Sequence, residues 1–145
     1  MLDHDYFMKQ AIKLALQAAE ADEVPIGAVV VADQTIIGKG FNQTRLLNDC
    51  TAHAEMIAIT AACEHLGNPY LEDCTLYVTI EPCTMCAGAL YWSRIGQVIY
   101  GASEPKFGFT RYTEPVLHKK TTLTGGVLAD ECSMIMQNFF REKRA

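Results

Sequence analysis

Short apolar runs rich in β-branched residues alternate along this chain with longer segments of helical periodicity. The runs at 26–31, 75–80 and 98–100 are predicted to be buried strands, and helical patterns separate them. Because strands separated by helices form a sheet that is covered on both faces, the alternation predicts a three-layer α/β/α fold. A turn at 33–34 and an apolar return over 36–41 add a hairpin, so the central sheet is expected to be mixed.

Four helices and a fifth strand complete the expected order of elements. The predicted helices are near 5–21, capped by Asp3 or Asp5; near 52–66, after the capping residues 48–51; from Pro82, at the first helical position, to about 95; and from Asp130 onward. The fifth strand is predicted at 121–124, after a loop that starts at Gly101. A chain of 145 residues is typical of one domain with its own core, so we expect a single domain over 1–145.

Nothing in the sequence points to a membrane or to export. No apolar run is long enough to cross a bilayer, and the acidic N-terminus lacks the basic-then-apolar layout of a secretory signal. We therefore expect a cytoplasmic protein without a membrane partner, whose six cysteines are reduced thiols. Cys63, Cys74 and Cys132 fall in apolar segments and are expected in the core.

The charge of the chain is a weak guide to its partner. The formal net charge of −5 argues against nucleic acid, which binds basic surfaces. Arg141, Lys143 and Arg144 nevertheless gather at the C-terminal end. On the pattern alone, such a run is typical of a solvated helix end.

Two short motifs, each at the predicted start of a helix, carry residues suited to metal chemistry. They are TAHAE at 51–55 and EPCTMC at 81–86, which together form the zinc-deaminase signature H-x-E…P-C-x-x-C. Cys83 and Cys86 are three residues apart and share one helical face, at a helix N-terminus that favours the thiolate. His53 opens a second helix that leaves the same sheet edge. The three side chains predict one Zn²⁺ per subunit, with the fourth tetrahedral position left for water.

Glu55 is the predicted catalytic residue of this site. Zinc lowers the pKa of its bound water toward 7, and a nearby carboxylate can take the proton from that water and deliver it to the substrate. His53 and Glu55 are two positions apart, so in the middle of a helix they would point to nearly opposite sides. The motif therefore works only if both residues lie at the first turn.

Other interpretations compete with a catalytic zinc site. A lone C-x-x-C is often a redox pair or half of a structural zinc site, and a lone His-x-Glu is usually chance. Cys50, three residues before His53, is a possible fourth ligand that would close the site and make it structural. The two motifs together favour the catalytic interpretation, because Glu55 needs a water on which to act.

Beyond the metal motifs, the sequence resembles the bacterial tRNA adenosine deaminases, which convert the wobble adenosine to inosine. The similar segments are VPIGAV at 24–29, TAHAE at 51–55, TLYVT at 75–79, EPCTMCAGA at 81–89, SRI at 93–95, GA at 101–102, GVLADEC at 126–132 and FFR at 139–141. The resemblance implies a five-stranded mixed sheet, a homodimer and the tRNA anticodon stem-loop as partner. Two features depart from the family: Cys50 stands where Pro is usual, and 107–112 is bulkier than the small-residue loop expected there.

The same resemblance implies a set of substrate-binding residues. Asn42 would hydrogen-bond the flipped nucleoside, and the remaining residues would meet the target base or its neighbours: Ala54, Glu104, Lys106, Phe140 and Arg141. Judged from the pattern alone, Asn42 is a turn residue, Glu104 and Lys106 lie in a solvated loop, and Phe139 is a core residue.

Two other functions stay open at this stage. One is a deaminase of a free base or nucleoside, such as guanine, cytosine or cytidine, with the same metal site. The net charge and the bulky 107–112 loop favour it, although that loop also offers stacking surface for unpaired bases. The other is a zinc-binding module without activity, against which Glu55 and the open coordination position count.

Overall fold

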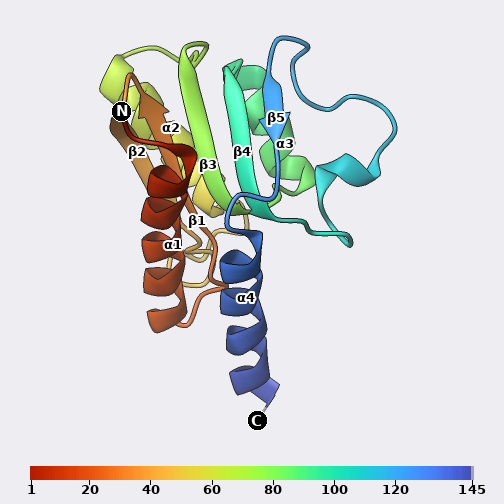
Figure 1. Ribbon diagram of the computed structural model, residues 1–145. Coiled ribbons are helices and arrows are strands. Elements are labelled where there is room, and N and C mark those ends of the chain that lie inside the picture. The colour runs from red at the N-terminus through yellow and green to blue at the C-terminus, as the bar shows by residue number, and fades with distance from the viewer. Residues whose placement is uncertain (145) are drawn as a thin grey trace.

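The computed structural model describes residues 1–144, and in it four helices enclose a five-stranded sheet (Figure 1). The helices are α1 His4–Glu20, α2 Ala54–Leu66, α3 Thr84–Ser93 and α4 Ala129–Arg144. The strands are β1 Gly27–Ala32, β2 Thr35–Phe41, β3 Cys74–Ile80, β4 Gln97–Ala102 and β5 Thr122–Thr124. No helix in this part of the chain is both long and apolar enough to span a bilayer.

The strand order is β2-β1-β3-β4-β5. β1 runs antiparallel to β2 and to β3, whereas β3, β4 and β5 run parallel to one another. The first pairing is the hairpin expected from the turn at 33–34, and the parallel pairings follow from the helix or long connection between the strands. The predicted mixed sheet is therefore confirmed.

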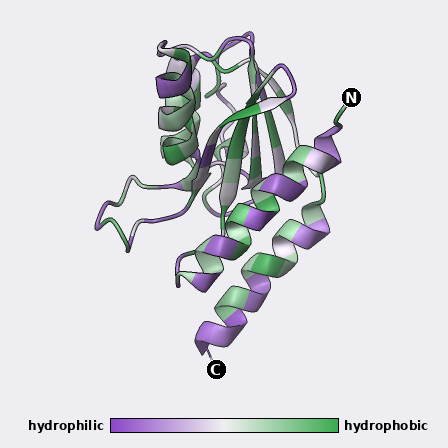
Figure 2. Cartoon of the chain, turned by 90° about the vertical axis from the view of Figure 1, so that its left-hand side faces the viewer, coloured by the Kyte–Doolittle hydropathy of each residue, from purple (hydrophilic) through white to green (hydrophobic). Residues whose placement is uncertain are grey.

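Helices cover both faces of the sheet, which confirms the three-layer α/β/α fold. α1 and α4 lie side by side on one face (Figures 1 and 2), and the core beneath them includes Phe7, Met8 and Cys132. α2 and α3 cover the other face, over a core that includes Leu76, Leu90 and Val98. Each strand of the centre thus buries both of its faces, as its continuous apolar run predicts.

α2 packs closely on the β1–β2 hairpin, and this contact fixes the position of the first turn of the helix. Gly38 and Gly40 in β2 face the backbone of α2, and a Cβ at either glycine would overlap a carbonyl oxygen of the helix, that of Ala58 or Ala54. Only glycine permits this approach. The first turn of α2 is therefore held directly against the end of β2.

The starts of α2 and α3 differ from the predictions. His53 and Cys83 are the N-caps of α2 and α3, with extended backbones (φ −76°, ψ 156° and φ −72°, ψ 173°), so neither helix begins at 52 or at Pro82. The expected cap at 48–51 was also wrong, because Asp49 accepts hydrogen bonds from the backbone N–H and hydroxyl of Thr51 within a turn. Gly67, in the left-handed region, is the C-cap of α2, so the helix ends at Leu66, as the predicted range 52–66 requires.

The cysteines expected in the core are not equivalent. Cys74 and Cys132 are buried, as predicted. Cys63 is only half-buried at the end of α2, where its sulfur lies 3.6 Å from the carbonyl oxygen of Pro69. The predicted long loop after β4 contains a short 3₁₀ helix, Phe109–Arg111, which the sequence pattern did not indicate.

Candidate active site

Two helix starts meet at the end of β3 and bring three potential metal ligands together. The Nδ1 atom of His53, at the N-cap of α2, lies 3.6 Å from the sulfur of Cys83 and 3.5 Å from the sulfur of Cys86. The three donor atoms all lie within 4.8 Å of one another. Cys50, the alternative ligand, is exposed and is not part of this group.

The donor set fits a tetrahedral zinc ion. Zn–N of about 2.0–2.1 Å and Zn–S of about 2.3 Å separate nitrogen and sulfur by about 3.6 Å, which agrees with both measured separations. Hydrogen bonds from Cys86 and His53 stabilise the Cys83 thiolate and lower the pKa of Cys83 to about 3. The same hydrogen bond to Cys83 raises the pKa of Cys86. Thiols bind metal as thiolates, so a divalent ion displaces thiol protons when it binds.

Glu55 lies beside these ligands as the second residue of α2. Its side chain is only 3% exposed, and its Oε1 atom has no hydrogen-bond partner among residues 1–144. Burial raises the pKa of Glu55 to about 7. A buried carboxyl oxygen without a hydrogen-bond partner lowers the stability of the fold. Its presence here indicates that this oxygen meets a water or a substrate. His53 lies just before the helix and Glu55 lies in its first turn. The two side chains can therefore face the same site although they are only two positions apart.

Asn42, which is expected to hydrogen-bond the nucleoside, is buried next to this site. It follows β2, and the backbone N–H of Gln43 donates to the carbonyl oxygen of Ala52, just before His53. Ala54 is fully buried between the ligand and Glu55, against Gly40 of β2. The structure therefore brings Asn42 and Ala54 into the neighbourhood of the metal ligands.

Comparison with known proteins assigns this arrangement to a family. The model of the MafB19-like deaminases matches residues 2–144. This chain belongs to that deaminase family. The tRNA-specific adenosine deaminase of Agrobacterium fabrum (strain C58) is 45% identical over 149 residues, which cover 99% of this chain and 98% of that protein.

Two solved structures of related proteins show the same architecture. One comes from a study of A-to-I editing by tRNA:A34 deaminases at the wobble position of transfer RNA. It has a TM-score of 0.85 and 44% identity, and the match covers 90% of this chain and 98% of that one. The other is the guanine deaminase from Bacillus subtilis, with a TM-score of 0.69 and 43% identity over 75% of this chain and 73% of that one. As a member of the family, the protein is a hydrolytic deaminase.

The other predicted substrate contacts of this deaminase lie around one surface hollow. Glu104, Phe140 and Arg141 line it together with Met136, Gln137 and Arg144, and its volume is about 450 Å³. Lys106 is exposed on the loop just beyond Glu104. Within the basic C-terminal run, Lys143 instead pairs with Asp22, so that its charge is partly neutralised.

Two buried glutamates support the deaminase site and were not singled out from the sequence. The Glu81 carboxylate accepts hydrogen bonds from the backbone N–H of Glu104 (3.0 Å) and from the backbone N–H and hydroxyl of Thr110 (2.9 and 2.7 Å). Glu23 accepts hydrogen bonds from the backbone N–H groups of Arg45 (3.2 Å) and Leu46 (2.7 Å). Each glutamate therefore fixes a loop beside the active site. Glu81 adjoins the P-C-x-x-C motif, and that adjacency is the only sequence signal for either residue.

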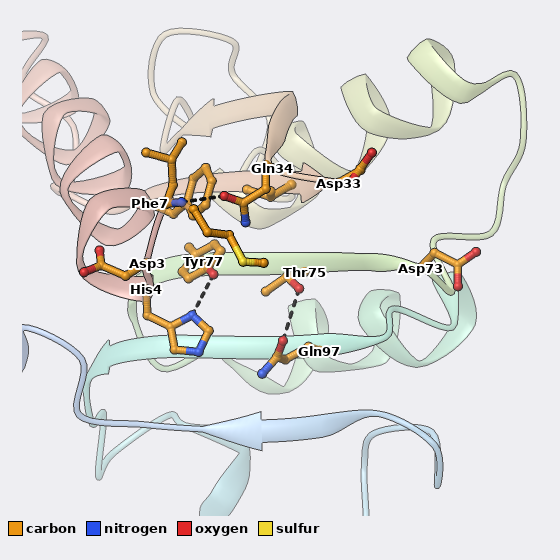
Figure 3. Close-up of a pocket in the computed structure, with 12 residues that line it drawn as sticks. Asp3, His4, Phe7, Asp33, Gln34, Asp73, Thr75, Tyr77 and Gln97 are labelled. Atoms are coloured by element: carbon orange, nitrogen blue, oxygen red, sulfur yellow. Dashed lines mark hydrogen bonds between the residues drawn. The ribbon is translucent and has the colours of Figure 1, made fainter.

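A second hollow lies at the opposite end of the sheet, where β3 and β4 begin (Figure 3). Its volume is also about 450 Å³, and it contains none of the metal ligands. Two pairs of its polar groups meet: the Nδ1 of His4 lies 2.8 Å from the Tyr77 hydroxyl, and the Thr75 hydroxyl donates to Gln97. The deaminase chemistry therefore belongs to the end of the sheet that carries His53 and Cys83.

Proposed function

We propose that this deaminase converts adenosine to inosine at the wobble position of tRNA. The observation that carries the proposal is the buried, unpartnered oxygen of Glu55 beside three converging donor atoms. Similarity over nearly the full length to a tRNA-specific adenosine deaminase supports adenosine in tRNA as the substrate. An enzyme with this substrate would act in the cytoplasm, and we propose the whole of 1–145 as its single domain.

We further propose that His53, Cys83 and Cys86 hold one Zn²⁺ per subunit. One imidazole nitrogen and two thiolates form a donor set typical of zinc, and a set of three leaves a coordination position for water. When bound, the ion supplies a Lewis acid that lowers the pKa of that water.

The chemistry of the protein itself then rests on Glu55. Its carboxylate accepts a proton from the attacking water, whose oxygen forms the new bond to the amidine carbon of the base. Glu55 delivers that proton to the ring nitrogen. It then takes the second proton from the hydroxyl now bonded to the carbon and passes it to the amine, so that the carbon–nitrogen bond breaks, the carbonyl forms and ammonia leaves. Burial suits this role, since a carboxyl group with a pKa near neutrality both accepts and donates protons readily.

The RNA-binding residues are part of the same proposal. They are Asn42, Ala54, Glu104, Lys106, Phe140 and Arg141. Their support is spatial: Asn42 and Ala54 adjoin the metal ligands, and Glu104, Phe140 and Arg141 share one surface hollow. Aromatic and arginine side chains in such a hollow suit the stacking and pairing of unpaired bases.

We also propose that the enzyme acts as a homodimer through the outer face of α3. Tyr91 and Trp92 are exposed there, Trp92 to 76%, and such apolar surface is typical of an interface. Light scattering is expected to give twice the mass of the chain for the wild type and for Met134→Asp, an exposed residue on α4. Trp92→Asp should give the single mass; an unchanged dimer would exclude this face.

A guanine deaminase is the second candidate, because the Bacillus subtilis enzyme is 43% identical over three quarters of the chain. The deciding experiment measures ammonia release from the zinc-loaded enzyme. The substrates are an arginine-tRNA anticodon stem-loop, guanine, cytosine, cytidine and adenosine. We expect turnover of the stem-loop alone, whereas turnover only of a free compound would contradict the tRNA proposal.

A further inference from the structure

The connection from β4 to β5 swings out beside α3 (Figure 1), but its first part is held firmly against the active site. Gly108 forms an isolated β-bridge with the metal ligand Cys83, and the backbone N–H of Phe109 donates to the carbonyl oxygen of Pro82. The buried carboxylate of Glu81 adds the hydrogen bonds described above. The segment 105–112, called here the aromatic loop, therefore has a fixed position next to the metal site.

Two aromatic side chains of this loop point into solvent. Phe107 is 57% exposed and Tyr112 is 46% exposed. Each carries a cation over its ring: the ammonium nitrogen of Lys106 lies 5.4 Å from the centre of Phe107, and the guanidinium carbon of Arg111 lies 4.5 Å from that of Tyr112. Arg111 is itself held by a hydrogen bond to the carbonyl oxygen of Gly108. Each ring therefore has a cation beside it.

The charge of the loop differs from that of the whole chain. The protein carries a net charge of −5, yet the aromatic loop contains Lys106 and Arg111 and no acidic residue. The flanking Glu104 carboxylate is engaged by the backbone N–H groups of Lys106 and Phe107. A partner that is both anionic and planar fits this surface, and RNA with unpaired bases has both properties.

We propose that Phe107 and Tyr112 stack on unpaired bases that flank the target nucleotide. Lys106 and Arg111 contact the phosphates beside it. The proposal rests on the proposed tRNA activity and adds a binding surface to it. The β-bridge between Gly108 and Cys83 carries the argument, because Phe107 is adjacent to Gly108 and thus stands at the edge of the metal site. A base next to the target would meet this ring first.

The test measures binding of a fluorescent anticodon stem-loop to the zinc-loaded Glu55→Gln enzyme, over a range of salt concentrations. Phe107→Ala and Tyr112→Ala are each expected to weaken binding by about fivefold or more, since one stacked base contributes about 1–3 kcal/mol. The salt slope should stay unchanged in both. Lys106→Gln should instead reduce the slope by about one phosphate contact.

Matched controls separate stacking from folding. Phe107→Tyr and Tyr112→Phe keep a ring and should bind as the wild type does. Tyr70 is the control at another site, because it is 41% exposed and has the Arg94 guanidinium 4.6 Å above its ring, but lies between α2 and β3. Tyr70→Ala should leave binding unchanged. In active enzyme, the alanine variants of the loop should raise KM and leave kcat unchanged.

Three results would overturn the proposal. The first is wild-type affinity in both loop alanine variants. The second is weaker binding that comes with loss of the dimer, which would make the aromatic loop a protein contact. The third is equal weakening in Tyr70→Ala. Failure of the proposed function is distinct from all three, because the wild-type enzyme itself would then leave the stem-loop unmodified.

Discussion

At the scale of single residues, Glu55 combines deep burial with an oxygen that no group of residues 1–144 satisfies. A purely structural carboxylate is expected to accept hydrogen bonds, as Glu81 and Glu23 do. The contrast between these buried glutamates separates the proposed proton carrier, Glu55, from the two residues that fix loops. It depends on the surroundings of each side chain, which the amino-acid type alone does not reveal.

Replacement of Glu55 by glutamine tests its role directly. Glu55→Gln is nearly isosteric and leaves His53, Cys83 and Cys86 in place, so zinc content by mass spectrometry should match the wild type. Turnover should fall by at least about a hundredfold, because the amide cannot carry a proton. Substantial remaining turnover would remove Glu55 from the proposed mechanism.

The ligand set makes a second prediction for single residues. Cys83→Ala and Cys86→Ala should each lose zinc during dialysis, since two ligands hold the ion far more weakly than three. Cys50→Ala should retain one zinc per chain, because the Cys50 side chain is exposed and apart from the cluster. Loss of zinc from the Cys50 variant would show that the site has a different composition.

The sequence was sufficient to name the residues that the structure brings together. Motif spacing predicted that His53, Cys83, Cys86 and Glu55 would share one site. The donor atoms of the first three do lie together, and the charges of Cys83 and His53 are close enough to affect the pKa of Glu55. Glu81 and Glu23 could not be predicted in the same way. Their partners are backbone N–H groups of loops 20 or more residues away, and no spacing rule links a side chain to such groups.

At the scale of elements, the starts of α2 and α3 matter more than the rest of these helices. Periodicity predicted both helices but placed their first residues too early, because Pro82 and the polar residues at 48–51 look like ordinary end signals. In the structure, the candidate ligands His53 and Cys83 are instead the N-caps, without a capping hydrogen bond from either side chain. Their side chains are therefore available to a metal.

The contact between β2 and α2 gives a prediction at this scale. Gly40→Ala would place a methyl group against the carbonyl oxygen of Ala54 and push the first turn of α2 outward. We expect a loss of about 1–3 kcal/mol in the free energy of unfolding, together with weaker zinc binding. Gly88→Ala in α3 meets open space within the chain and, in the Trp92→Asp monomer, should instead stabilise by about 0.5–1 kcal/mol. Denaturant unfolding measures both changes, and a neutral Gly40→Ala would contradict this packing.

The hydrogen bonds that the Glu81 carboxylate accepts from Glu104 and Thr110 give a further prediction, for the segment 104–110. Glu81→Gln replaces one accepting oxygen by a donor that faces other donors, so the loop should loosen. Hydrogen exchange at the amides of Glu104 and Thr110 is expected to accelerate, and KM for the stem-loop is expected to rise. Glu64→Gln, at an exposed position on α2, is the control. Unchanged exchange in Glu81→Gln would mean that the loop is held by other contacts.

At the scale of the whole molecule, sequence reasoning predicted the class of fold and the family. Alternating strands and helices gave the α/β/α layers, and the mixed sheet followed from one hairpin. The resemblance to tRNA adenosine deaminases is confirmed by relatives that carry that name. Composition could not predict the distribution of charge over the surface, because Arg141 and Arg144 of α4 and Glu104 meet only in the folded chain.

The distribution of charge gives a prediction for the whole enzyme. Affinity for the stem-loop should fall by about tenfold or more between about 50 mM and 200 mM salt, as phosphate contacts release counterions. Arg141→Gln should reduce that salt slope by about one contact. Lys143→Gln should change it less, since Asp22 already pairs with Lys143. Affinity that is independent of salt would argue for a small neutral substrate instead.

Zinc-edge X-ray absorption of the purified enzyme tests the central claim most directly, because it counts the atoms around the ion. The expected first shell contains two sulfur atoms at about 2.3 Å from the zinc ion. One imidazole nitrogen and one oxygen from exchangeable water are expected at about 2.0–2.1 Å from the ion. That result would place an open position beside the oxygen of Glu55. A first shell made of four protein ligands, or a purified protein that binds no metal ion, would contradict the account.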